Sequence, residues 1–147
     1  MTQEEKDLLL KDLCARLPYN VKAYVKNWSK LDKKYYEDIY DVKSVFPSLN
    51  EVHVQSKTGS VNVLFGHPDY DIKPYLFPLS SMTEEQKNKL QNKLIELELK
   101  AINDEINHTK VAEYEIDFYN QNHIDFRGFI EKGLAIEAPE GMYKFNK

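Results

Sequence analysis

Glycine, cysteine and arginine are scarce in this chain, and each shortage argues against a class of site. Five glycines among 147 residues, without a GxxxxGK or GxGxxG motif, leave no phosphate-binding loop of the common kinds. A single cysteine, Cys14, excludes an intrachain disulfide and a CxxC redox pair. The only arginines are Arg16 and Arg127, which weakens the case for nucleic-acid recognition, because bidentate contacts to phosphate and guanine favour arginine.

Long apolar runs are also missing. No segment approaches the roughly 20 apolar residues of a membrane-spanning helix. The acidic start, MTQEEKDLLLKDLC, is unlike a secretion signal. We therefore expect a cytoplasmic protein with no membrane partner.

The net charge of −4 lies entirely in the second half of the chain. Residues 1–82 hold 11 basic and 11 acidic side chains, which cancel, whereas residues 83–147 hold 9 basic and 13 acidic ones. So small a charge argues against an acidic nucleic-acid mimic and against a protein that coats DNA without specificity.

Enough apolar residues are present for a folded chain. The sequence is 41% hydrophobic and 12% aromatic, and its 147 residues can bury a sizeable core. Ten tyrosines combine an apolar ring with a polar hydroxyl, which suits a core edge or a contact surface. We expect a single domain over residues 1–147.

The spacing of apolar residues changes once, at residues 80–83. Before this point they mostly alternate, as in strands, and after it they recur every three or four residues, as in helices. The predicted fold class is therefore α+β: a small antiparallel sheet or SH3-like open barrel, preceded by a short helix and followed by a helical C-terminal half. Residues 1–82 would form the helix plus β-rich half, and residues 83–147 the helical half packed on it.

One helix and four short strands are predicted in the first half. Thr2 opens a capping box, and Pro18 ends the helix. Pro74 and Pro78 argue against a central strand, so residues 71–82 are expected to form an extended or 3₁₀ segment packed across the sheet. Alternation predicts the strands at residues 21–28, 37–46, 50–55 and 61–65.

A long helix with two apolar stripes is predicted in the second half. Thr83 and Gln86 form a second capping box, which opens a helix over residues 83–107. The neighbours of its stripes are either the sheet and a C-terminal helix or, for one stripe, a second subunit in a homodimer through helix 83–107. The stripes lie on different sides of the helix and consist of Leu90, Leu94, Leu97 and Ala101, and of Ile95, Leu99, Ile102 and Ile106.

Residues 111–121 allow two assignments. Tyr114, Ile116 and Phe118 alternate with acidic residues as in a strand, whereas Val111, Tyr114 and Phe118 fit one face of a helix. We favour the helix because the flanks are helical and glycine and proline are absent. A short helix is then expected at residues 126–132, followed by an extended tail.

Three strings carry a resemblance to a known group of proteins. KDLCARLPYNVK, IKPYLFPLSSMTEEQK and HIDFRGFIEKGLAIEAPEGMY resemble segments of short, uncharacterised proteins of gut Bacteroidales, often encoded in their prophages or mobile elements. These strings make up roughly a third of the chain and leave out the region between Tyr24 and Gly66. The resemblance implies a cytosolic bacterial or phage setting and supplies no catalytic residues.

The strongest functional pattern is a basic and aromatic strand face. Alternation places Lys22, Tyr24, Lys26 and Trp28 on one side of the first strand. Rings can stack on bases while ammonium groups meet phosphates, the same residues can anchor a protein partner, and an ordinary solvent face has the same pattern. The following residues extend the basic and aromatic character with Lys33, Lys34, Tyr35 and Tyr36.

A catalytic set is harder to find. His123, Asp125 and Arg127 could supply an acid–base pair or two metal ligands, but a metal site needs three or four ligands. The alternative is that Asp125 caps the next helix while Arg127 pairs with an acidic neighbour. We therefore predict no catalytic, cofactor-binding or metal-binding residues.

The predicted function is that of a small non-enzymatic adaptor or modulator with a protein partner. Tyr24, Trp28, Tyr35 and Tyr36 would anchor the partner, guided by the neighbouring lysines. Two alternatives stay open: a nucleic-acid-binding module on the same face, and an enzyme with a diffuse site near His123, Asp125 and Arg127.

Overall fold

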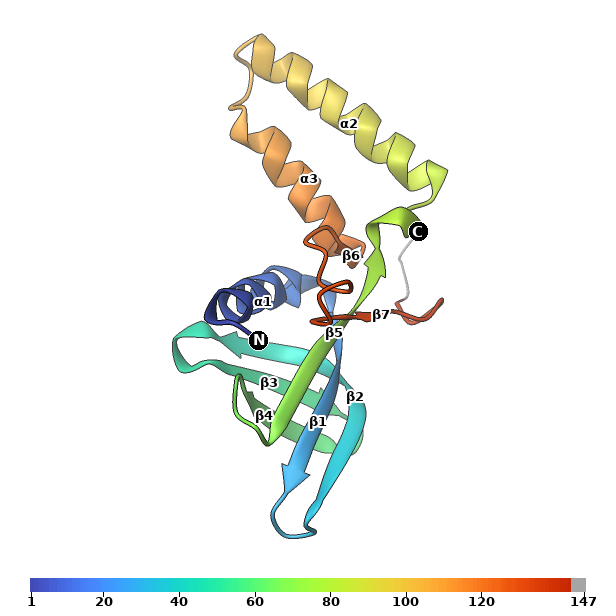
Figure 1. The fold of residues 1–147 in the computed structure, drawn as a ribbon. Helices are drawn as coiled ribbons and strands as arrows, with labels where there is room; N and C mark the ends of the chain where they lie inside the picture. The colour runs from blue at the N-terminus through green and yellow to red at the C-terminus, as the bar shows by residue number, and fades with distance from the viewer. Residues whose placement is uncertain (144–147) are drawn as a thin grey trace.

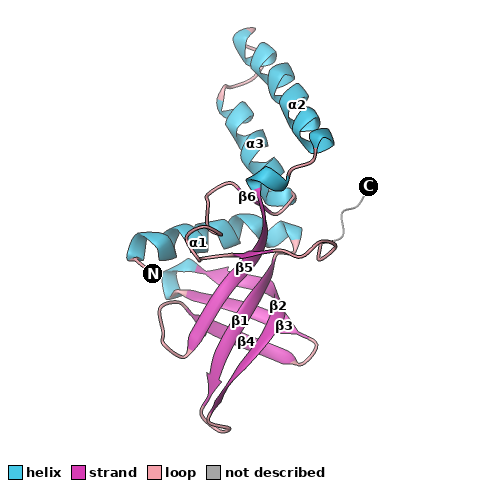
Figure 2. Ribbon diagram, turned by 45° about the vertical axis from the view of Figure 1, so that its right-hand side comes forward, coloured by secondary structure: helices cyan, strands magenta, loops and turns pink. Residues whose placement is uncertain are grey.

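The structure is a computed structural model, and it describes residues 1–143. A curved sheet crossed by one helix forms the body of the molecule, and a pair of helices projects from one end (Figure 1). Figure 2 shows the same division between the strands and the projecting helices. The elements are α1 (Gln3–Arg16), β1 (Lys22–Ser29), β2 (Lys34–Phe46), β3 (Glu51–Ser56), β4 (Gly59–Leu64), β5 (Tyr70–Pro78), α2 (Glu84–Ile102), α3 (Thr109–Gln121), β6 (Ile124–Asp125) and β7 (Ile136–Glu137).

Helix α1 begins and ends as its residues predict. The Thr2 hydroxyl accepts a hydrogen bond from the Glu5 N–H at 3.1 Å, and the Glu5 carboxylate accepts one from the Thr2 N–H at 2.8 Å. These two bonds satisfy donors that a helix N-terminus leaves free. The helix ends at Arg16, and a 3₁₀ turn containing Pro18 leads into β1.

The sheet is mixed and open. Its strand order is β4-β3-β2-β1-β5-β6, with β7 also paired to β5. The first five strands pair antiparallel, as predicted, whereas the two-residue strands β6 and β7 run parallel to β5. The α+β class is therefore confirmed, with an open sheet rather than a closed barrel.

The prediction that Pro74 and Pro78 exclude a central strand is wrong, because β5 contains both prolines and lies between β1 and β6. The Trp28 N–H donates to the Asp69 carbonyl at 2.8 Å, so bonded pairs alternate along this ladder and the Ala23–Pro74 pair falls at a non-bonded position. The N–H that Pro74 lacks would therefore point away from β1 and would not bond to it. Pro78 is the last residue of the strand, so neither proline interrupts a donor that the β1 ladder needs.

The main core lies between α1 and the concave face of the sheet. Val21, Ala23 and Val25 are fully buried, as the alternation in the first strand predicts. Phe129 and Ala135, from the segment between β6 and β7, close this core at one side. Its other buried members are Leu9, Leu10, Leu13, Tyr40, Val42, Val52, Val54, Val63, Phe65, Ile72 and Leu76.

Helices α2 and α3 form an antiparallel pair with a small core of their own. Met82, Leu90, Phe118 and Ile124 are its buried members. The helical assignment of residues 111–121 is confirmed, whereas α2 ends at Ile102 rather than residue 107. The short helix expected at residues 126–132 is wrong, since this segment consists of turns. Within the expected extended tail, residues 144–147 lie outside the described residues.

Candidate binding surface on the β1–β2 hairpin

The hairpin of β1 and β2 extends beyond the body of the sheet (Figure 1). Strand β2 begins at Lys34, three residues earlier than predicted, and all eight residues of β1 pair with it. Leu31 in the turn is 91% exposed, the highest exposure among the large apolar side chains of residues 1–143. The hairpin therefore presents its tip and both faces to an incoming molecule.

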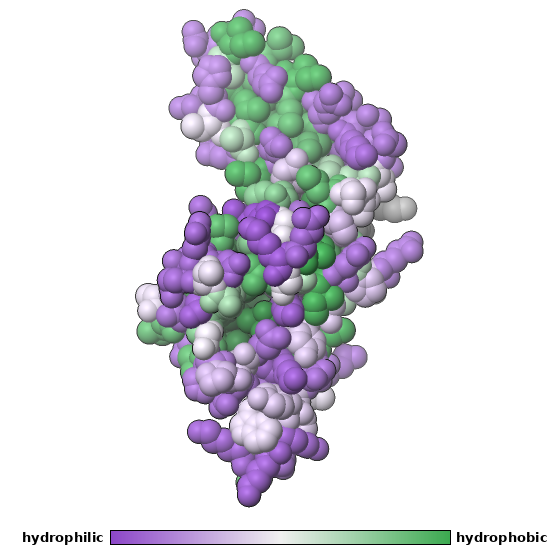
Figure 3. All heavy atoms as spheres, in the orientation of Figure 1, coloured by the Kyte–Doolittle hydropathy of each residue, from purple (hydrophilic) through white to green (hydrophobic). Residues whose placement is uncertain are grey.

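An aromatic and aliphatic cluster lies on the convex face of this hairpin. The register pairs Trp28 with Tyr35 and Tyr24 with Ile39. The Trp28 and Tyr35 rings meet edge to face at 4.9 Å between centroids, and the Lys26 Nζ lies 4.6 Å from the centroid of Tyr35. Figure 3 shows pale residues of intermediate hydropathy gathered over this end, bordered by hydrophilic ones.

Two of the predicted lysines are neutralised by acidic side chains on β2. The Lys22 Nζ lies 2.6 Å from Asp41 Oδ1, and the Lys26 Nζ lies 4.0 Å from Glu37 Oε1. The register explains both contacts, because it places Lys22 opposite Asp41 and Lys26 opposite Glu37. The convex face is therefore aromatic with balanced charge rather than strongly basic.

The remaining predicted residues do not all join this face. Tyr35 does, whereas Tyr36 and Lys34 lie on the opposite face, where the Lys34 Nζ is 4.8 Å from the Tyr36 ring centroid. The Tyr36 hydroxyl donates to the Asp32 carboxylate. Lys33 occupies the turn with φ of +52°. The structure thus brings together Lys22, Tyr24, Lys26, Trp28 and Tyr35.

The pKa of the Tyr24 hydroxyl depends on its burial and on acidic neighbours. Burial raises the pKa of Tyr24, and the negative charges of Glu37 and Asp71 raise it further. The hydroxyl therefore stays protonated at neutral pH and can donate a hydrogen bond.

Sequence reasoning missed Ile39, which is 44% exposed and lies beside the aromatic residues. Because the predicted second strand began at residue 37, its alternation was not traced back to Tyr35. Tyr35, Glu37, Ile39 and Asp41 share a face by their odd numbers alone, which is the signal that identifies Ile39.

In the second candidate set, which is His123, Asp125 and Arg127, the last two residues are engaged in structural contacts. Both carboxylate oxygens of Asp125 accept backbone N–H groups, from Phe129 at 2.9 Å and Ile130 at 2.8 Å. Arg127 Nε donates to Asp12 Oδ1 at 3.2 Å. Arg127 therefore pairs with an acidic residue, as the structural alternative predicted, whereas Asp125 holds the backbone of a turn segment instead of capping a helix.

His123 is buried against the ring of Tyr143, with the two rings stacked at 3.6 Å between centroids. Burial lowers the pKa of His123 to about 4, helped by the positive charge of Arg16. As pH falls from about 6.5 to 4, the unfolded chain therefore gains a proton that the folded chain does not bind. The folded state loses stability over this window, and the loss can reach about 3 kcal/mol.

We expect the variant His123→Phe to flatten this pH dependence, because phenylalanine keeps a ring against Tyr143 and does not titrate. Thermal unfolding of both proteins between pH 7 and pH 4 measures the effect as a difference in slope. The slope is the relevant quantity because residue 123 has φ of +56°, a conformation that also affects absolute stability. Equal slopes for the two proteins would assign the pH dependence to other groups.

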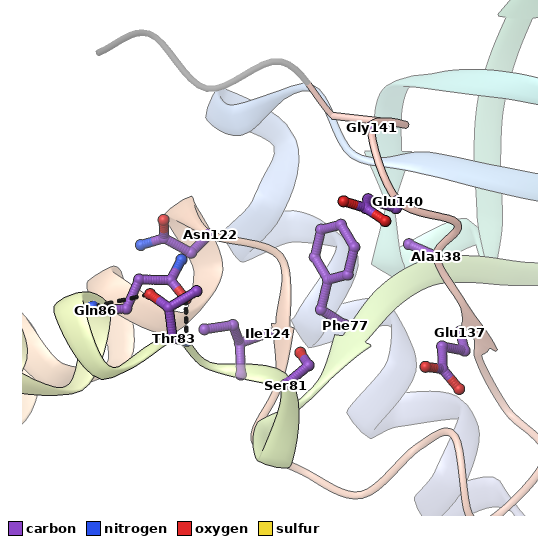
Figure 4. Close-up of a pocket in the computed structure, with 10 residues that line it drawn as sticks. All are labelled: Phe77, Ser81, Thr83, Gln86, Asn122, Ile124, Glu137, Ala138, Glu140 and Gly141. Carbon is purple, nitrogen blue, oxygen red and sulfur yellow. Dashed lines mark hydrogen bonds between the residues drawn. The ribbon is translucent and has the colours of Figure 1, made fainter.

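A cavity of about 440 Å³ lies near His123, between the end of β5, the start of α2 and the C-terminal segment (Figure 4). Hydroxyl groups on its wall already have partners: the Thr83 hydroxyl accepts from the Gln86 N–H at 3.1 Å, and the Ser81 hydroxyl donates to the Pro78 carbonyl at 2.6 Å. The cavity is lined by Phe77, Ser81, Thr83, Gln86, Asn122, Ile124, Glu137, Ala138, Glu140 and Gly141, and so by none of the second candidate set.

Within residues 1–143, no helix is both long and apolar enough to cross a membrane. No three His, Cys, Asp or Glu side chains of these residues come together as a potential metal site. Comparison with models of known protein families gave no match, and comparison with curated proteins and with solved structures gave none either.

Proposed function

We propose that this protein is a small non-enzymatic adaptor or modulator that binds another protein through the convex face of the β1–β2 hairpin. The observation that supports this proposal is the Trp28–Tyr35 edge-to-face pair, with Tyr24 and Ile39 beside it on the same face. Tryptophan and tyrosine dominate the energetically important residues of protein interfaces, because they bury a large rigid area at little entropic cost. Tyr24 adds a further large ring with a polar hydroxyl to this face.

The balance of charge favours a protein over a nucleic acid as the partner. Lys22 and Lys26 face Asp41 and Glu37, which would repel phosphates. Both arginines of the chain contact Asp12 in the body of the molecule, away from the hairpin. A polar rim around an aromatic centre is the usual arrangement in protein interfaces.

Nucleic acid remains the second candidate because the hairpin turn carries Lys30, Lys33 and Lys34 against Asp32 alone. Binding through these lysines would weaken steeply with salt. Protein binding through the aromatic face would change little with salt, since most of its energy comes from apolar burial.

The resemblance to short proteins of gut Bacteroidales and their prophages supports the proposed setting, the cytoplasm of a bacterium. In that setting, a host or defence protein is the proposed partner. An enzyme site near His123, Asp125 and Arg127 is the least favoured function, because Asp125 and Arg127 are engaged by contacts within the fold and the His123 ring is buried against Tyr143.

The decisive experiment is capture of partners from a host lysate, with nuclease, comparing the natural protein with two variants. We expect the double variant Trp28→Ala plus Tyr35→Ala to lose a partner protein that the natural chain retains. Tyr36→Ala is the matched control, because Tyr36 is 40% exposed against 48% for Tyr35 but lies on the opposite face. A partner lost equally from both variants, or released by nuclease, would contradict the proposal.

A further inference from the structure

Within α2, one of the two apolar stripes is exposed to solvent. Leu90 and Leu94 of the first stripe belong to the small core shared with α3, and Ala101 of the same stripe is also buried. The second stripe lies about 140° around the helix from this contact. Its residues stay open to solvent: Ile95 is 50% exposed, Leu99 57% and Ile102 70%.

The residue types of this stripe, Ile-Leu-Ile, are the same when the helix is followed in either direction. Ile95 precedes Leu99 by one turn, and Ile102 follows it by nearly one turn. When two such helices pack antiparallel about a twofold axis near Leu99, Leu99 meets Leu99 and Ile95 meets Ile102 in both halves. Such self-complementarity is what a symmetric interface between identical chains requires.

We propose that a second copy of this chain covers this stripe, and that α2 packs antiparallel against α2 of that copy with Leu99 on the twofold axis. The two helical pairs then form a four-helix arrangement with α2 helices inside and α3 helices outside. Packing of this kind buries side chains spaced every three or four residues, which is the spacing of Ile95, Leu99 and Ile102.

The charged residues beside the stripe pair mainly within their own helix. Within one chain, Glu96 lies 3.2 Å from Lys93 and 3.4 Å from Lys100. Lys100 lies roughly 130° around the helix from the centre of the stripe, so the charge of Glu96 is balanced within its own chain and away from the proposed interface. Glu98 lies on the other edge and comes near Glu98 of the second copy, so this like-charge contact weakens the interface.

The shape of the molecule leaves room for the second copy. The helical pair projects from the body, with the start of α2 near the body and its end far from it (Figures 1 and 2). An antiparallel contact therefore places the two bodies at opposite ends of the helical bundle. Three apolar side chains from each copy form a small interface, so we expect dissociation in the micromolar range rather than an obligate dimer.

Light scattering after size-exclusion chromatography, over a wide range of protein concentration, tests the proposal. We expect the natural chain to change from monomer to dimer as concentration rises. Leu99→Glu places two carboxylates at the axis and should raise the dissociation constant at least tenfold. Ile116→Glu is the matched control on the outer side of α3, where Ile116 is 42% exposed, and it should dimerise like the natural chain.

Variants with opposite charges at residue 99 distinguish this interface from any other. Leu99→Glu and Leu99→Lys should each be monomeric alone and should form a mixed dimer when combined, because opposite charges then meet at the axis. A natural chain that stays monomeric, a Leu99→Glu variant that still dimerises, or mixed variants that stay apart would each overturn the proposal. Trp28→Ala plus Tyr35→Ala should leave dimerisation unchanged, so this test is independent of partner binding by the hairpin.

Discussion

Replacing Asp12 with alanine is expected to lower the free energy of unfolding by about 3–5 kcal/mol, because it leaves buried cationic groups without their counter-charge. Asp12 and Arg16 are both fully buried, and Arg16 Nε lies 2.8 Å from Asp12 Oδ2. Arg127 reaches the other carboxylate oxygen at 3.2 Å. One carboxylate therefore compensates both arginines of the chain.

This cluster also connects distant parts of the chain. Arg16 donates to the Ile124 carbonyl at 2.7 Å, so the end of α1 is tied to β6. Phe126 lies beside both cations, 5.9 Å from the Arg16 guanidinium carbon and 4.6 Å from that of Arg127. Loss of Asp12 should therefore loosen the contact between α1 and the C-terminal segment as well as the ion pairs themselves.

Chemical denaturation followed by circular dichroism measures the effect. Asp7→Ala is the matched control, because Asp7 is an exposed carboxylate on the same helix, and its loss should change the unfolding free energy by less than about 0.5 kcal/mol. If Asp12→Ala unfolds with nearly the stability of the control, water or another group must compensate Arg16, and the cluster contributes little.

Local rules predicted much of the fold from the sequence. The capping boxes at Thr2 and Thr83 identified the starts of α1 and α2, since each box depends only on residues three positions apart. Strict alternation identified the buried side of β1. The second stripe of α2 was also visible in the sequence, and the structure shows that α3 covers only the first.

Contacts between distant residues account for what the sequence did not reveal. The charge of Lys22 is balanced by Asp41, and only the β1–β2 register places them together. The Asp12–Arg127 contact joins residues 115 positions apart, so no local sequence pattern predicts it. The assignment of β5 was wrong because a proline is excluded only from positions that donate to the ladder, and these positions depend on the register.

Phe129→Ala is expected to be the second most damaging change, with a loss of about 3–5 kcal/mol from the buried ring and the cavity it leaves. Phe129 is 1% exposed and belongs to the main core, although it lies in a segment of turns. Its backbone is fixed on both sides: the N–H donates to Asp125 at 2.9 Å, and the carbonyl accepts from Leu134 at 2.9 Å. The surrounding backbone therefore cannot move inward to fill the space.

Phe46→Ala is the matched control for this prediction, since Phe46 is 45% exposed at the end of β2 and its loss should cost less than about 1 kcal/mol. Equilibrium unfolding in urea gives both values. An unchanged m-value would show that the surface area exposed on unfolding is the same in the variants as in the natural chain. Equal stabilities for the two variants would mean that the turn segment is not part of the cooperative core. A large loss for Phe129→Ala alone would show that these turns stabilise the sheet as much as a regular element does, because Phe129 is their large side chain that is fully buried in the core beneath α1.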